Sequence, residues 1–146
     1  MKKILLLTLS LAIIAVSGAM GRDVSKQDAR KVAVNAFYEK MNQYDEGISY
    51  SDVVVTYDYT RYSNGQPAFY AFDFAGGGFM IISASDVYQP VIGYAFKGEY
   101  PKGEHAYVYS SFMQNYVDQI DYIRENNIVA EEAVSAEWKH FLTDEV

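Results

Sequence analysis

The residues in this chain that could transfer a proton near neutral pH are two histidines, His105 and His140. The chain contains no cysteine, so it cannot use a cysteine nucleophile or form disulfides. A serine nucleophile would need one of the two histidines as its base. Neither histidine lies in a recognisable catalytic context, and the sequence has no Gly-x-Ser-x-Gly elbow. The sequence therefore predicts a protein that is not an enzyme.

Two short motifs have the composition of catalytic loops, but each has a simpler explanation. Ser83-Ala84-Ser85-Asp86 follows an apolar run, where serine and aspartate commonly hold a turn by hydrogen bonds to the backbone. Gly76-Gly77-Gly78 precedes a strand-like run, whereas phosphate-binding glycines open a helix and usually add a lysine. We therefore expect a turn and a hairpin. Because the histidines are isolated and carboxylates do not recur at ligand spacing, no metal or other cofactor is expected.

The first 19 residues predict a secretory signal peptide. The basic pair Lys2-Lys3 precedes an apolar run, and the small residues Ser17-Gly18-Ala19 follow it. The run is too short to span a bilayer comfortably. We expect cleavage after Ala19, a product exported to the periplasm or the cell exterior, and one mature domain over residues 20–146.

The charge of the mature chain restricts the classes of molecule that it can bind. Removing residues 1–19 takes away two lysines and changes the formal net charge from −7 to −9. About 127 residues are left, enough for one domain to fold without disulfides. Nucleic acids and anionic membranes attract clustered lysine and arginine. We therefore expect no nucleic-acid partner and no membrane insertion after cleavage.

Hydrophobic periodicity predicts an α+β domain: an N-terminal helix packed on a four-stranded antiparallel meander, followed by two C-terminal helices. The first helix is expected over residues 26–41. Strands are expected over residues 53–60, 68–74, 79–83 and 91–96. Asn64-Gly65 is a strong type I′ hairpin turn, and Pro90 precedes what should be an edge strand. The last two helices are expected around residues 112–123 and 130–142.

The same periodicity predicts which side chains are buried. Along the first strand, the residues expected to share one face are Val53, Val55, Tyr57 and Tyr59. An aromatic row on the sheet is expected to form the core under a helix: Tyr57, Tyr59, Tyr70 and Phe72. The expected buried stripe of the long helix is Phe112, Tyr116, Ile120 and Ile123, reinforced by Met113 and Val117. The tyrosines in or beside turns are the better candidates for contact with a partner: Tyr62, Tyr100, Tyr107 and Tyr109.

Two stretches carry a likeness to a known family. The first reads Gly78-Phe79-x-Ile81-x-Ser83-x-x-Asp86, followed by Pro90-Val91-Ile92-Gly93-Tyr94, and the second includes Phe112, Tyr116 and Ile120. In this order they resemble the propeptide of streptopain-type cysteine proteases and the stand-alone inhibitors similar to it. The likeness implies structural roles for these residues and covers nearly the whole mature chain. Because the sequence stops at Val146, we expect an inhibitor separate from its enzyme.

The resemblance implies that the chain non-covalently occludes the cleft of a streptopain-like, papain-fold cysteine protease, and it extends to assisting the folding of that enzyme in trans. The contacting loop would comprise Gly98, Glu99, Tyr100, Pro101, Lys102, Gly103, Glu104 and His105, with Tyr100 as the anchor. Streptopain's own propeptide has Asn-Gly in this loop, so the present loop either docks differently or does not inhibit streptopain itself. Two alternatives stay open: a secreted tyrosine-rich module that binds glycan or peptide, and a proprotein remnant without a partner.

Overall fold

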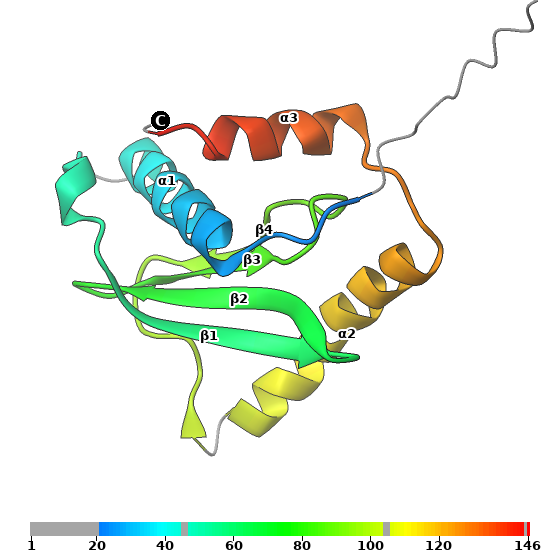
Figure 1. Cartoon of the computed structure of the whole chain (residues 1–146). Coiled ribbons are helices and arrows are strands. Elements are labelled where there is room, and N and C mark those ends of the chain that lie inside the picture. The colour runs from blue at the N-terminus through cyan, green and yellow to red at the C-terminus, as the bar shows by residue number, and fades with distance from the viewer. Residues whose placement is uncertain (1–20, 45–46, 104–105, 145) are drawn as a thin grey trace, which may run out of the picture.

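The computed structural model describes residues 21–44, 47–103, 106–144 and 146. The predicted signal peptide lies outside the described residues, as do Glu104 and His105. The elements confirm the predicted α+β class and their order along the chain (Figure 1). They are α1 (Lys26–Tyr44), the 3-10 helix η1 (Tyr50–Asp52), β1 (Val55–Ser63), β2 (Gln66–Phe74), β3 (Phe79–Ser83), β4 (Val91–Ala95), α2 (Ala106–Glu125) and α3 (Glu132–Phe141).

The sheet separates two layers of helices. Its strands pair antiparallel in the order β1-β2-β3-β4, so β4 is an edge strand as predicted. Helices α1 and α3 cover one face, and α2 covers the other (Figure 1). The α1-side core includes Phe37, Tyr70, Phe72, Phe74, Met80, Ile82, Trp138 and Phe141. The smaller α2-side core comprises Ala68, Phe69, Ala71, Ile81, Tyr100, Met113 and Val117.

Helix α1 packs as its sequence predicts. Its buried face includes Ala29, Val32, Ala33, Ala36 and Phe37, which recur at helical spacing. The small side chains let the helix approach the sheet closely, and the Phe37 ring stacks on Phe74 with centroids 4.1 Å apart. At its start, the backbone N–H of Asp28 donates to Ser25 Oγ at 3.0 Å, which caps the first turn.

Both predicted hairpins are confirmed. Asn64 and Gly65 have φ angles of 51° and 79°, as a type I′ turn requires. Gly76, Gly77 and Gly78 all have positive φ. Gly78 is also confined in space, because a Cβ there would lie 2.8 Å from the carbonyl oxygen of Ala95 and from the Phe37 ring.

The prediction that one face of the first strand carries Val53, Val55, Tyr57 and Tyr59 is wrong. Val55 pairs with Phe74, but the next pair is Tyr57 with Asp73, so Thr56 forms a bulge. Paired residues point to the same side of a sheet. Val55 therefore faces the α1-side core, whereas Tyr59 packs against the α2-side core and Tyr57 is 41% exposed. Only Tyr70 and Phe72 of the predicted aromatic row lie in the α1-side core.

On α2, the predicted burial of Ile120, Met113 and Val117 is confirmed, and the predicted burial of Phe112 is wrong. The buried side chains are Met113, Val117 and Ile120, whereas Phe112 is 59% exposed. The reason lies in the segment before the helix, which brings Tyr100 under the first turns of α2. The ring of Tyr100 packs edge-on against Tyr109, with centroids 5.4 Å apart. Together they fill the space that the sequence pattern assigned to Phe112.

Candidate functional site

The predicted contact loop leaves β4 beside the glycine hairpin that joins β2 to β3. We refer to residues 97–103 as the 97–103 loop. The backbone N–H of Gly78 donates to the carbonyl oxygen of Gly98 at 2.7 Å, and Gly98 itself has a φ of 80°. The hairpin thus fixes the start of the loop, which runs over the α2 face of the sheet towards the first turn of α2 (Figure 1).

Tyr100 does not project from this loop. Its side chain is 6% exposed and lies in the α2-side core. It stacks on Tyr59 at 5.3 Å and meets Phe79 and Tyr109 edge-on at 5.9 and 5.4 Å. Burial among these rings raises the pKa of the Tyr100 hydroxyl well above its ordinary value. In the free protein the ring is therefore the loop's attachment to its own sheet and is not exposed, and its role as the anchor stays a prediction.

The loop is also held by a buried carboxylate, that of Asp73 on β2. Asp73 is 1% exposed. Its Oδ1 accepts from the backbone N–H of Tyr100, and its Oδ2 pairs with Lys102 Nζ, each at 2.7 Å. Lys102 Nζ also lies 3.8 Å from the centre of the Tyr57 ring. Two residues that flank Pro101 are thereby tied to the same strand.

What the loop exposes is its polar apex. Glu99, Lys102 and Gly103 are exposed, and Pro101 is half-buried. Of the other loop residues predicted to contact a protease, Gly98 is exposed, and Glu104 and His105 lie outside the described residues.

An exposed apolar cluster lies next to the loop on the first turns of α2. Tyr107, Val108 and Phe112 are 79%, 73% and 59% exposed. The sequence predicts Tyr107 as a contact residue and Phe112 as a core residue, whereas Val108 was not predicted in either role. The signal was present, because Val108 and Phe112 are four residues apart and form a second apolar stripe beside the buried one. Solvent-facing apolar side chains gathered in one place mark interaction surfaces.

Comparison with known families identifies the chain. The model of the Spi protease inhibitor family matches residues 21–120, more than half of the sequence. The chain belongs to the Spi protease inhibitor family. No curated protein and no solved structure matches it. Membership supports a protease inhibitor role, and the matched segment contains both the 97–103 loop and the exposed cluster on α2.

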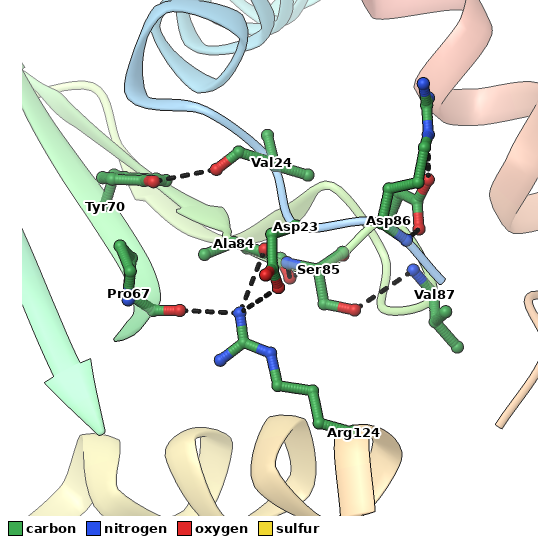
Figure 2. Close-up of polar contacts among 11 residues, drawn as sticks. Asp23, Val24, Pro67, Tyr70, Ala84, Ser85, Asp86, Val87 and Arg124 are labelled. Carbon is green, nitrogen blue, oxygen red and sulfur yellow. Dashed lines mark hydrogen bonds and ion pairs between the residues drawn. The ribbon is translucent and has the colours of Figure 1, made fainter. Parts of the chain in front are cut away.

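A second polar cluster in this Spi-family chain holds its N-terminal segment on the sheet. Arg124 reaches from α2 towards that segment, and its Nη2 donates to the carboxylate of Asp23 at 3.0 Å and to the carbonyl oxygen of Pro67 at 2.7 Å (Figure 2). The hydroxyl of Tyr70 donates to the carbonyl oxygen of Val24 at 2.8 Å. The segment preceding α1 is thus joined to both β2 and α2, which is a structural function.

The remaining family-motif residues have structural surroundings. Ser83 Oγ accepts from the backbone N–H of Ser85 at 3.0 Å, which confirms a turn held by serine at this point. Asp86 instead accepts from the backbone N–H of Arg22 at 2.7 Å and so joins the turn to the N-terminal segment. Pro90 is buried. Phe79 and Ile92 pack against the α2-side core, Gly93 pairs with Ile81 there, Tyr116 is half-buried, and Tyr94 is 41% exposed.

His140 pairs with Glu39 on the surface rather than with a nucleophile. Within the part of the chain that the structure describes, no three histidine, aspartate or glutamate side chains gather into a possible metal site. The described helices also include none that is long and apolar enough to cross a membrane.

The loop attachments predict sensitivity to alkaline pH. The hydrogen bond to Asp73 raises the pKa of Lys102, and burial raises the pKa values of Tyr100 and Tyr109. A group whose pKa is raised by folding stabilises the folded state. Its full contribution is present at pH values below the pKa of the unfolded chain, which is 10.0 for tyrosine and 10.5 for lysine. Above those values the unfolded chain releases protons that the folded chain keeps, so stability falls. We expect the urea midpoint to decline above about pH 10.

Tyr100→Phe supplies the control for this alkaline decline, because it keeps the ring and removes one of the raised groups. The decline should be smaller in this variant. An equally steep decline in Tyr100→Phe would contradict the assignment to Tyr100.

Proposed function

We propose that this chain is an exported inhibitor of a streptopain-type cysteine protease, and that it covers the substrate cleft without forming a covalent bond. The contacting surface would combine the apex of the 97–103 loop with Tyr107, Val108 and Phe112 on α2. Family membership supports inhibition of a protease. The observation that carries the proposed surface is the exposed apolar cluster beside a loop fixed to its own sheet.

Physical features of this surface suit cleft binding. Aromatic side chains at the centre of an interface supply much of the binding energy when a partner desolvates them. A loop with one fixed conformation loses little entropy on binding. The apex of the loop carries Glu99 and Lys102, so it presents charges of both signs to a partner.

The alternative of a tyrosine-rich glycan or peptide module has less support. It would require exposed tyrosines clustered on the sheet. Among the described residues, the exposed tyrosines are distributed over α1, β1, β4 and α2: Tyr44, Tyr57, Tyr62, Tyr94, Tyr107 and Tyr122. The sheet tyrosine Tyr70 is buried.

The test is a titration of purified residues 20–146 into an active, mature streptopain-type protease, with peptide hydrolysis as the readout. We expect stoichiometric, reversible loss of activity. Phe112→Ala should weaken inhibition by roughly thirtyfold, the effect of losing one central aromatic contact.

Val129→Ala is the matched control for Phe112→Ala. Val129 is 55% exposed, but it lies in the connection between α2 and α3, at the opposite end of α2 from the loop (Figure 1). It should inhibit like the wild type. The proposal fails if the folded wild-type protein does not inhibit, and the proposed surface fails if both variants inhibit equally well.

A further inference from the structure

Asp73 is an unusual residue for the inside of a small sheet. It lies near the end of β2 on the side facing α2, and its side chain is 2% exposed. A buried carboxylate is costly unless it is paired and hydrogen-bonded. Both of its oxygens have partners, and both partners come from the 97–103 loop rather than from the neighbouring strands.

The two hydrogen bonds of the Asp73 carboxylate reach the loop on opposite sides of Pro101. Oδ1 accepts a hydrogen bond from the backbone N–H of Tyr100, which fixes the main chain just before Pro101. Oδ2 accepts a hydrogen bond from Lys102 Nζ, which fixes the side chain of Lys102 just after Pro101. Lys102 is further confined between the Tyr57 ring and the carboxylate of Glu99, whose Oε2 lies 3.5 Å away. One carboxylate therefore clamps the loop on both sides of its apex.

We propose that Asp73 is the positioning residue of the inhibitory surface: its carboxylate holds Tyr100 and Lys102 so that the apex at Pro101 meets the protease in a single conformation. The proposal rests on the function proposed above. Asp73 is buried, so it cannot touch the protease while the loop keeps this conformation. Its effect on inhibition acts through the loop.

Two consequences follow from this clamp. The loop loses its conformational entropy when the protein folds rather than when it binds the protease, which strengthens inhibition. The clamp also keeps the apex from opening into a flexible substrate, because cleavage of a folded segment depends on how often that segment opens. Loss of the clamp should therefore weaken inhibition and make the loop cleavable.

The experiment compares Asp73→Asn, Lys102→Met and the double variant with wild type over residues 20–146. Asparagine keeps the shape of Asp73 and an acceptor for the Tyr100 N–H but loses the charge pair. Lys102 has a side chain that is 40% exposed, so Lys102→Met tests the clamp in a variant that should fold. The matched control is Lys31→Met, because Lys31 pairs with Asp144 at the same 2.7 Å, is 36% exposed and lies on α1.

Three readouts separate positioning from general stability. Amide hydrogen exchange of residues 98–103 reports opening of the loop in the free protein, and the urea midpoint reports global unfolding. Inhibition of a mature streptopain-type protease, with mass spectrometry for cleavage inside the loop, reports function. We expect both single variants to exchange faster in the loop, to inhibit roughly tenfold less well and to be cleaved there. The double variant should exchange and inhibit much like either single variant, because each single substitution already breaks the Asp73–Lys102 pair.

The outcomes are distinguishable. Asp73→Asn and Lys102→Met variants that lower only the urea midpoint, with wild-type loop exchange and inhibition, would overturn the role of Asp73 while leaving the inhibitor function intact. A wild-type protein that fails to inhibit would overturn the proposed function and the inhibitory role of Asp73 together. Effects of the same size in Lys31→Met would show that any lost ion pair suffices and would also overturn the proposal.

Discussion

Replacing Tyr100 by alanine is expected to lower the free energy of unfolding by about 3 kcal/mol or more, the usual cost of removing a buried aromatic ring. The ring is 6% exposed and contacts Tyr59, Phe79 and Tyr109. Its removal opens a cavity in the smaller of the two cores and detaches the loop. Urea denaturation followed by tyrosine and tryptophan fluorescence measures the change.

Tyr100→Phe is the matched variant, because it keeps the ring and removes only the hydroxyl. We expect its unfolding free energy to stay within about 1 kcal/mol of wild type, with inhibition unchanged. If Tyr100→Ala instead has wild-type stability and yet no inhibition, the ring must leave the core and contact the protease directly. That result would confirm the predicted anchor role of Tyr100.

Asn35→Ala is expected to cost about 3 kcal/mol, because it removes the hydrogen bonds of a fully buried side chain and takes the Asn35 donor away from the buried carbonyl oxygen of Phe141. Asn35 is fully buried in α1, and its Nδ2 donates to the carbonyl oxygens of Phe141 and Thr143, both at 2.9 Å. Its Oδ1 accepts from the hydroxyl of Tyr50 at 2.5 Å. The variant should lower the urea midpoint and speed amide exchange in α3, since these bonds join α3 to α1.

Asn42→Ala tests whether burial is the reason for the large effect of Asn35→Ala. Asn42 is on the same helix and also makes side-chain hydrogen bonds, to the carbonyl oxygen of Tyr38 and from the backbone N–H of Ile48, but it is exposed. Its replacement should cost less than about 1 kcal/mol. Equal losses at the two positions would contradict the argument from buried polar groups.

Periodicity was sufficient to predict the order of the main helices and strands, although it missed η1 and the first turns of α2. The small buried residues of α1 recur at helical spacing, and Asn64-Gly65 dictates a tight turn. The strand order follows from short connections, which favour pairing between neighbours in sequence.

The candidate site was harder to predict because it depends on contacts between distant residues. The bulge at Thr56 has no local signature, and it reverses the faces of Tyr57 and Tyr59. The backbone of Tyr100 is bonded to Asp73, which is 27 residues earlier and reads as an ordinary polar position in a strand. Once Tyr100 occupies the space under α2, Phe112 is left outside, a consequence that helical spacing alone cannot supply.

The division of the core by the sheet has a consequence for how such inhibitors diverge. The α1-side core contains most of the buried apolar residues, whereas the loop and the exposed α2 residues belong to the opposite side. If the proposed surface contacts the protease, substitutions that change the preferred protease can accumulate on the α2 side while the α1-side core continues to stabilise the fold. Distant members of the lineage should therefore differ most in the 97–103 loop and the first turns of α2, and Asp73 should change only together with Lys102.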